Sequence, residues 1–510
     1  MLTWEFPPRI VGGISTHVYE LSRALVSKGI DVHVVTCDFP KTPDRETVDG
    51  VKIYRVKCSK ICKSNFLAWI YYMNSLMIEC GSRVLKGSDF DVIHAHDWMV
   101  ARASVELSDR YNIALVSTIH ATEFGREDHC DKDHINNTNK NLRHRIEEDD
   151  DFGKTISCTE RTLILQSDRV ICASKYMRNH ISQIFNVSVE DVDVIPNAID
   201  VSRFLTAKNY FINEDVRSNL GLQRESKIIL YVGRLVKEKG IYTLIDAFDN
   251  LLRHYGQLQQ ESSSNLRLII VGEGHLKKDL MRYVCQRRLQ RYVHFTGFVD
   301  ERTKIALYHS SDVCVIPSLY EPFGIVALEA MACGIPIVAS DIGGLSEIVE
   351  NNVTGLKVQA GVSDLLTVAI MNLIDNPSLA RQLASNAYGC VKRKYNQELL
   401  AEKTISAYLE AVRRKGNSAF VKGEHNTADF LTDYSLRSLL LTLGIVDRKK
   451  SKTAGDIATK IKAPEVRVKL VLGRLASQGY VSTTSNLTAG KKVSYHLTES
   501  GILGTCGVYS

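Results

Sequence analysis

The sequence contains no apolar run approaching the roughly 18–20 residues that a membrane-spanning helix needs. Its opening stretch, Met-Leu-Thr-Trp-Glu-Phe-Pro-Pro, lacks the basic region and apolar core of a secretory signal. The 12 cysteines are scattered and form no C-x-x-C pair, so we expect no disulfides. These absences predict a protein of the reducing cytoplasm with no transmembrane segment.

Net charge is also small, at +6 over 510 residues, and it is unevenly placed. Residues 431–510 hold twelve Lys and Arg against five Asp and Glu, a balance of +7, which leaves −1 for the rest of the chain. With 44% hydrophobic and 24% charged residues, the composition is that of a globular protein. A chain of this length predicts two or three domains, with the basic character confined to the last.

The most informative stretch is the turn that runs from Glu321 to Gly324. An apolar run at residues 313–316 reads as a buried parallel strand, and a helix is predicted after the turn, ended by Gly334. Such a turn places a helix N-terminus at the carboxyl end of a sheet, where phosphate binds. Glu321 and the helical Glu329 then lie within reach of whatever the phosphate carries. An ordinary strand–helix unit with a Glu at its cap is the alternative.

Similar turns recur along the same half of the chain. Residues 227–240 read as strand, tight turn and helix start, with Arg234 and Lys239 flanking the turn. Fixed cations there would stabilise the charge of a departing diphosphate. Further glycine turns follow apolar strands at residues 268–274, 293–299 and 340–347, the last with Gly343 and Gly344. The repetition predicts a doubly wound α/β domain.

The first half of the chain shows the same pattern. Gly12 and Gly13 precede a helix predicted over residues 14–28, and paired glycines let the backbone approach a ligand closely. The glycines end a loop that runs from Trp4 to Gly13, and only three residues precede it, so we expect the true start to lie upstream, the alternative being a missing first strand. A later strand, predicted over residues 114–119, delivers His120 to the edge of the sheet where ligands bind.

Two groups of residues could suggest a metal site. His94, His96 and Asp97 lie at the end of a predicted strand, but alternation places the two histidines on one face and Asp97 on the other. No third ligand at suitable spacing is evident. A polar segment over residues 127–160, which reads as a loop, holds a second set: His129, Cys130, Asp133 and His134. We expect no metal site from either group.

The segment E-P-F-G-I-V-A-L-E-A-M resembles the Glu-x7-Glu motif of retaining glycosyltransferases of the glycogen-synthase-like superfamily, family 4 in particular. The G-R-L-x-x-x-K-G and H-x-H-D-W segments are similar to other motifs of that family, and the likeness covers roughly residues 1–410. It implies a GT-B fold, in which two Rossmann-like domains face each other across the active site. The implied divisions are 1–195 for the acceptor-side domain, 196–396 for the nucleotide-sugar domain and 397–415 for a crossover helix. Residues 416–430 are polar and low in large apolar side chains, which predicts a linker.

The resemblance also implies roles for individual residues. It places His120 against the donor sugar near the reacting carbon, and Glu329 against the ribose hydroxyls. The implied catalytic set is His120, Glu321, Arg234 and Lys239. The implied donor-binding set adds Gly12, Gly13, Phe298, Phe323, Gly324, Ile325, Glu329, Gly343 and Gly344. The implied acceptor side consists of His96, Asp97, Glu123 and Arg126.

The same family implies a nucleotide-sugar donor, such as UDP-glucose or ADP-glucose, a glycan acceptor, and no metal or other cofactor. The H-A-T-E-x-G-R segment resembles the branch that elongates α-glucans. Ile10 stands where starch and bacterial glycogen synthases have a lysine, which disfavours an ADP-glucose synthase of that type. One rival is a mannosyl- or N-acetylglucosaminyltransferase acting on a lipid or glycoside. Another is a nucleic-acid-binding regulator whose enzyme half senses a nucleotide sugar.

The last segment, residues 431–510, has a different pattern. Helices are predicted over 433–443, 454–461 and 464–478, and strands over 480–483 and 493–498 form a hairpin. This order resembles a winged helix-turn-helix domain. Basic side chains that could meet the phosphates of DNA are those of Arg467, Lys469, Arg474, Lys491 and Lys492. A protein-binding or regulatory module is an equal alternative.

Overall fold

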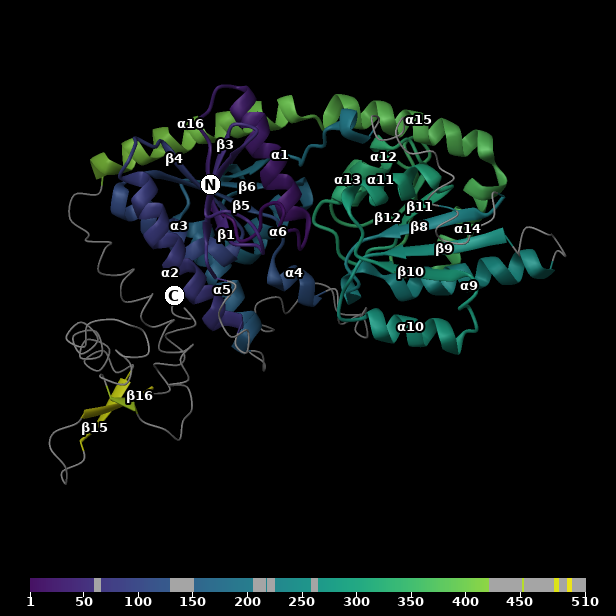
Figure 1. Ribbon diagram of the computed structural model, residues 1–510, viewed down its shortest axis with the longest axis horizontal. Coiled ribbons are helices and arrows are strands. Elements are labelled where there is room, and N and C mark those ends of the chain that lie inside the picture. Colours follow the sequence, from purple (N-terminus) through teal and green to yellow (C-terminus); the bar gives the residue numbers. More distant parts are fainter. Residues whose placement is uncertain are drawn as a thin grey trace.

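The computed structural model describes residues 1–58, 66–128, 151–204, 217, 225–257, 265–421, 452–453, 481–485 and 493–497. Figure 1 shows two α/β domains side by side, the first in purple and blue and the second in teal and green. The predicted two-domain α/β architecture is therefore confirmed. None of the helices in these ranges combines the length and the apolar character that crossing a bilayer requires.

The first domain is built on short strands rich in β-branched residues, which favour extended backbone. They are β1 (His33–Cys37), β2 (Arg45–Val48), β3 (Val51–Val56), β4 (Val92–His96), β5 (Ala114–Ile119), β6 (Arg169–Cys172) and β7 (Val192–Val194). The order is β1-β3-β2 on one side and β4-β5-β6-β7 on the other, and the pairs are parallel except β2 with β3. Leu2 bridges both Val35 and Ala95, so residues 1–3 lie between β1 and β4.

Helices cover this sheet: α1 (Gly13–Ser27), α2 (Phe66–Leu85), α3 (Ala101–Tyr111), α4 (Glu123–Asp128), α5 (Asp151–Gln166) and α6 (Lys175–Phe185). The prediction of a loop over residues 127–160 is wrong at its C-terminal end, because α5 already begins at Asp151. Ile156, Leu163 and Ile164 recur at helical spacing and are buried in the core of the domain. The cluster of His129, Cys130, Asp133 and His134 lies outside the described residues.

The second domain contains one parallel, six-stranded sheet in the order β10-β9-β8-β11-β12-β13. Its strands are β8 (Lys227–Val232), β9 (Leu266–Val271), β10 (Val293–Gly297), β11 (Val313–Ile316), β12 (Ile337–Ser340) and β13 (Leu356–Val358). The chain winds outward from β8 to β10, returns to β11 beside β8, and then winds the other way. The loops after β8 and β11 therefore part at a topological switch point, where open α/β sheets bind ligands.

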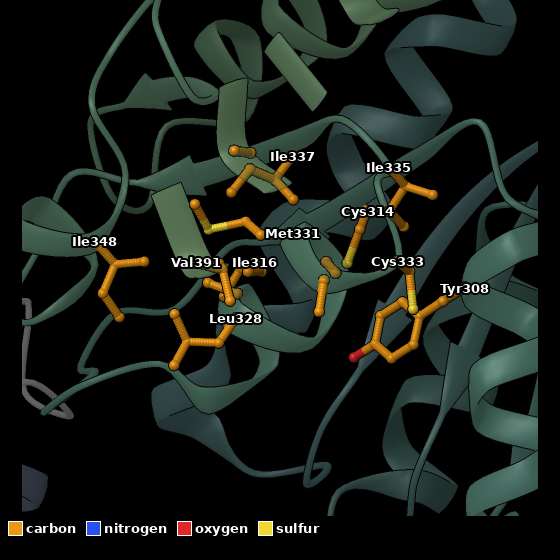
Figure 2. Close-up of a cluster of buried hydrophobic side chains, with 14 of the residues drawn as sticks. Tyr308, Cys314, Ile316, Leu328, Met331, Cys333, Ile335, Ile337, Ile348 and Val391 are labelled. Atoms are coloured by element: carbon orange, nitrogen blue, oxygen red, sulfur yellow. The ribbon is translucent and has the colours of Figure 1, made fainter. Parts of the chain in front are cut away.

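Seven helices of the described chain cover this sheet: α9 (Ile241–Gln257), α10 (Lys277–Gln286), α11 (Glu301–Ser310), α12 (Ile325–Ala332), α13 (Leu345–Ile348), α14 (Ser363–Asp375) and α15 (Pro377–Lys394). The strands read as continuous apolar runs because helices bury both faces of the sheet. Figure 2 shows one face, where Leu328 and Met331 of α12 lie among Ile316 of β11 and Val391 of α15. This burial holds the N-terminus of α12 at the switch point.

Helix α16 (Gln397–Val421) leaves the second domain and runs along the first (Figure 1). The hydroxyl of Tyr408 lies 2.7 Å from Nδ1 of His94, which ties the helix to the middle of β4. The crossover helix predicted at this place is confirmed. The linker predicted from residue 416 is wrong at its start, because the helix continues through Gly416, whose cost in a helix is only about 1 kcal/mol relative to Ala.

Part of the tail is also described. Strands β14 (Lys452–Thr453), β15 (Val481–Ser485) and β16 (Val493–Leu497) form an antiparallel sheet in the order β14-β16-β15. The predicted hairpin is therefore confirmed, with β14 as an additional strand. The three predicted helices lie outside the described residues, as do the side chains of Arg467, Lys469, Arg474, Lys491 and Lys492.

Candidate active site

Two turns are locked together at the switch point of the second domain. Gly240 follows β8 with a φ of 64°, and a Cβ at this residue would lie 2.0 Å from the carbonyl oxygen of Pro317. The N–H of Leu319 donates to the carbonyl oxygen of Glu238 at 2.8 Å. Only glycine permits so close an approach, so the turn after β8 fixes the position of the turn after β11.

A carboxylate and cations face each other across these turns. Glu321 Oε2 accepts from Lys239 Nζ at 2.7 Å and from Ser318 Oγ at 3.2 Å. The two charged side chains are only 13% and 17% exposed, so water screens their attraction weakly. Arg234 stays 49% exposed, with its guanidinium 3.2 Å from Glu238. An ammonium and a guanidinium group thus stand where an anion could meet both.

Glu329 lies in the middle of α12 and is 5% exposed. Its carboxylate accepts from Lys304 Nζ at 2.6 Å and from Tyr308 Oη at 2.9 Å. Burial, with Glu329 alongside, raises the pKa of Tyr308 well above its ordinary value, so the hydroxyl stays a donor. Sequence reasoning found Glu329 but missed these two partners. Their i,i+4 spacing on α11 puts them on one helix face, which is a signal that could have found them.

Three of the predicted glycines support the Glu321 turn. The N–H of Gly344 donates to the carbonyl oxygen of Glu321 at 2.9 Å, and a Cβ on Gly343 would lie 2.2 Å from the same oxygen. Gly324 caps α12 with a φ of 113°, a conformation that L side chains rarely adopt. These glycines therefore let the turn sit directly on the loop that follows β12.

The predicted apolar donor-side residues differ in exposure. Phe323 is 6% exposed and packs in the core, and Ile325 is partly buried at the first turn of α12. Phe298, which directly follows β10, is 67% exposed. Phe323 therefore positions the turn, whereas Phe298 is accessible to a ligand.

The first domain brings imidazole groups together. Nδ1 of His96, at the end of β4, lies 3.4 Å from Nε2 of His120, directly after β5. His17 of α1 joins them, with its ring centroid 4.9 Å from that of His120. Burial lowers the pKa of all three, to about 3 for His120, so the rings are uncharged at neutral pH. Sequence reasoning missed His17, because it lies within a helix and not after a strand.

Charged groups lie beside these rings. Arg126 donates to Glu123 at 2.8 Å, and the buried Glu160 accepts from the N–H of Glu123 at 3.0 Å. Asp97 accepts from the N–H of His120 at 2.8 Å. Burial raises the pKa of Asp97 to about 6 and that of Glu160 well above its ordinary value, against the opposing effect of Arg126. The predicted acceptor-side residues therefore lie together, and Glu160 is an addition that sequence reasoning missed.

The glycine-rich loop already holds a carboxylate of the chain itself. Glu5 Oε2 accepts from the N–H of Val11 at 2.6 Å and from that of Gly12 at 3.0 Å. Glu5 is 1% exposed, and burial raises its pKa to about 7. An anionic ligand at this loop would have to displace Glu5.

The faces of the two domains touch at two glycines. A Cβ on Gly13 would lie 3.0 Å from Cδ1 of Ile325, and a Cβ on Gly125 would lie 2.3 Å from the hydroxyl of Tyr320. The glycine-rich loop of the first domain therefore faces the N-terminus of α12 in the second. The loop after β5 likewise meets the Glu321 turn, and the boundary between these two faces is here called the cleft.

Comparisons with known proteins identify this arrangement. A family model described as Glycosyltransferase Family 4 matches residues 11–203, and one described as Glycosyl transferases group 1 matches residues 212–389. An uncharacterised glycosyltransferase of Methanocaldococcus jannaschii is 35% identical over 416 residues, which cover 82% of this chain and 99% of the relative. The chain belongs to this family of glycosyltransferases.

Other matches of this glycosyltransferase carry more specific names. A glycogen synthase of Mycobacterium tuberculosis is 33% identical over 427 residues, covering 81% of this chain and 94% of the relative. A solved sucrose-phosphate synthase of Thermosynechococcus elongatus matches with a TM-score of 0.64 and 25% identity, over 80% of this chain and 97% of the other. The catalytic domain of Starch Synthase IV from Arabidopsis thaliana, bound to ADP and acarbose, shares the fold with a TM-score of 0.62 and 17% identity. The match covers 81% of this chain and 98% of the other. The predicted GT-B fold is confirmed.

A cavity of about 430 Å³ in this glycosyltransferase lies elsewhere. Its lining includes Met1, Ile30, Phe90 and Tyr408, between the amino ends of β1 and β4. The glycines, cations and imidazoles of the cleft follow the carboxyl ends of their strands, at the opposite edge of the sheets. Because ligands of such sheets bind at the carboxyl ends, the cleft remains the candidate active site.

Proposed function

We propose that this glycosyltransferase moves a hexosyl unit, preferably glucose, from a nucleotide sugar to an α-glucan or related glycan with retention of anomeric configuration. The observation that supports this most is the pairing of Lys239 with Glu321 at the switch point, beside the N-terminus of α12. Cationic side chains and a helix N-terminus converge there, at the edge where α/β sheets bind phosphate groups.

The charges of the second domain suit a diphosphate leaving group. Negative charge builds up on the departing phosphate as its bond to the sugar breaks, and Arg234 and Lys239 are placed to neutralise it. Glu321 already holds Lys239 in position, so little reorganisation is needed at the moment of reaction. The proposed transfer uses these side chains and requires no metal ion.

The nucleoside of the donor would lie along the same domain. A carboxylate has about four acceptor positions, so Glu329 can accept from ribose hydroxyls while it keeps its bonds to Lys304 and Tyr308. The exposed Phe298 and the backbone around it lie at the carboxyl end of β10, where a base would be reached. A donor such as UDP-glucose or ADP-glucose fits this arrangement.

The first domain would receive the sugar and the acceptor. The uncharged ring of His120 can exchange hydrogen bonds with sugar hydroxyls near the reacting carbon, and the acceptor would meet His96, Asp97, Glu123 and Arg126. The relative named glycogen synthase supports glucose and an α-glucan as the pair. A mannosyl or N-acetylglucosaminyl donor with a lipid or glycoside acceptor is the rival.

The test is a donor and acceptor screen with the full chain. UDP-, ADP- and GDP-glucose, GDP-mannose and UDP-N-acetylglucosamine are incubated with and without glycogen, and nucleoside diphosphate release is measured. We expect a glucose donor to be used, faster with glycogen, and to give an α-linked product by proton NMR. Transfer from only GDP-mannose or UDP-N-acetylglucosamine would favour the rival, and a β-linked product would overturn retention. Activity should survive EDTA, and its loss would overturn the metal-free reaction.

A further inference from the structure

Three imidazoles from three separate elements converge on one point in the first domain. His17 of α1, His96 of β4 and His120 after β5 each offer a ring nitrogen, and these atoms all lie within 4.8 Å of one another. Tetrahedral zinc with nitrogen ligands at 2.0–2.1 Å requires nitrogens about 3.3 Å apart. The pair formed by His96 Nδ1 and His120 Nε2, at 3.4 Å, already has that separation.

One of these rings, that of His17, carries buried nitrogen atoms that make no well-formed hydrogen bond among the described residues. The polar side chain near them is that of Asn197, which acts against the effect of burial on the pKa of His17. His17 is 4% exposed and His96 is 0% exposed. Buried polar atoms are almost always satisfied in folded proteins, so these nitrogens point to a ligand. A ligand that accepts lone pairs from several imidazoles is a metal ion.

We propose that His17, His96 and His120 form a binding site for one divalent transition-metal ion of the zinc type. Imidazole nitrogen suits zinc, cobalt, nickel and copper, whereas magnesium and calcium prefer oxygen ligands. Burial keeps all three rings uncharged, which is the form that binds a metal. His120 is only partly buried, so the site opens on the side of this residue.

Neighbouring groups hold these rings in place. The ring of His94 lies against that of His96, tilted by 34° with the centroids 4.2 Å apart, and its own nitrogens lie 2.7 Å from Tyr408 Oη and from Thr118 Oγ1. Asp97 accepts from the N–H of His120 and adds a carboxylate beside the site. Such outer groups orient metal ligands and tune their affinity. The site is thus supported from the side of α16 as well as from the sheet.

The ion would have a functional consequence that rests on the proposed function. His120 is proposed to contact the donor sugar, and a metal bound to the same ring would take it away from the sugar. Zinc should therefore inhibit transfer, although transfer itself requires no metal. Removal of zinc by EDTA should restore the full rate.

The binding test uses the metal alone and does not depend on any activity. The full chain is freed of metal with EDTA, dialysed and titrated with Co²⁺, and visible d–d absorption is recorded. We expect one ion per chain. His17→Gln and His96→Gln should each weaken binding by about 100-fold or more, because loss of a direct ligand costs at least as much as loss of an outer partner. His254 is exposed on α9, so His254→Gln should leave Co²⁺ binding unchanged.

Thermal unfolding of each variant shows whether it is folded. A folded His17→Gln chain that binds Co²⁺ as tightly as the original would overturn the proposal. Sulfur-to-cobalt charge-transfer bands would also overturn it, because they would place the ion at a cysteine. If Co²⁺ binds through the histidines but zinc does not slow transfer, the site stands and the proposed contact of His120 with the sugar fails.

Discussion

The two faces of the cleft bury polar groups in different ways. On the second domain, Glu321 lies against Lys239 and Glu329 against Lys304, so each of these carboxylates has an ammonium partner. On the first domain, His17 lies against His120, and burial lowers the pKa of both. Buried charges are stable when opposite charges face them, and titratable groups in other surroundings become neutral.

This difference matches two halves of one substrate. A diphosphate carries charge into the departure step, so it requires fixed cations. Sugar hydroxyls are neutral and require groups that donate or accept hydrogen bonds without an ionic charge. Uncharged imidazoles alone would leave a diphosphate without a counter-charge, and on the first domain the ion pair of Arg126 with Glu123 lies beside the rings, on the side proposed for the acceptor.

The largest effect is expected when a cation is removed from the charged face. Arg234→Ala should lower kcat by roughly 10²-fold or more, because the guanidinium is proposed to act mainly as charge develops on the leaving group. The side chain is 49% exposed, so stability should change little. Steady-state kinetics of donor turnover, beside a thermal unfolding curve, measures both quantities.

Arg253→Ala is the matched control. Arg253 is 68% exposed and pairs with Asp249 one helical turn away on α9, outside the cleft. Its loss should leave kcat unchanged. If Arg234→Ala raised KM while kcat stayed the same, the guanidinium would act in donor binding alone.

A smaller effect, on stability, is expected from Glu5 in the glycine-rich loop of the first domain. Burial raises its pKa from an ordinary 4.5 to about 7. Between pH 4.5 and about 7, Glu5 holds a proton in the folded chain that it has released in the unfolded chain. The stabilisation is complete below pH 4.5 and is lost as pH rises through 7. At 1.36 kcal/mol per pKa unit, the loss is about 3 kcal/mol at most.

Glu5→Gln cannot titrate at this position. Relative to the original chain, its free energy of unfolding should therefore rise between pH 4.5 and 7 and then stay level. Chemical denaturation at several pH values measures this difference, with Glu79→Gln on the exposed surface of α2 as the control. Parallel curves for the original chain and Glu5→Gln would show that Glu5 titrates near its ordinary value in the fold.

The next effect concerns the affinity for the donor at Glu329 of the second domain. Glu329→Gln removes a charged acceptor and leaves Lys304 without its carboxylate partner. Loss of such a bond costs about 1.5–3 kcal/mol, so nucleoside diphosphate binding should weaken by roughly 10–100-fold. Isothermal calorimetry measures it, and Glu350→Gln, on the exposed surface after α13, is the control. Unchanged affinity in Glu329→Gln would refute the ribose contact.

The strands and turns of both faces could be predicted, because each is a local pattern. An apolar run followed by glycines, as at Gly343, marks a buried strand and the turn after it. The partners could not be predicted in the same way. Lys304 meets Glu329 only because α11 packs beside α12, and His17 meets His120 only because α1 covers β5. Such meetings depend on tertiary packing, which a strand-and-turn pattern does not contain.

Two predicted element boundaries, the end of the 127–160 loop and the start of the linker, were also wrong. Residues 151–160 are rich in polar groups, yet α5 begins at Asp151 because a few apolar side chains at helical spacing suffice to bury one face. The composition predicts a linker from Gly416, but helix α16 continues to Val421, because one glycine costs a helix only about 1 kcal/mol. In both cases the composition of a segment was a weaker guide than its periodicity.

The smallest effect is expected when the tail is removed. The proposed cleft residues all precede α16, so a chain ending at Val421 should keep its kcat within about twofold. A chain cut before Tyr408 is the contrasting control, because it loses the contact with His94 behind the imidazoles. It should be less stable. An inactive but folded 1–421 chain would show that the tail completes the enzyme.

A comparison of the full chain with the 1–421 chain also tests what the tail binds. If Arg467, Lys469, Arg474, Lys491 and Lys492 contact DNA phosphates, each contact adds about −0.9 to the slope of log affinity against log salt. Four to six contacts would then give a slope of roughly −4 to −5. In that case the full chain should bind a mixed-sequence duplex at about 50 mM salt and the 1–421 chain far more weakly, because the rest of the chain has no net positive charge to offer. Equal binding by both chains would move the contact to the enzyme domains. No binding by the full chain would leave the tail as a protein-binding or regulatory module.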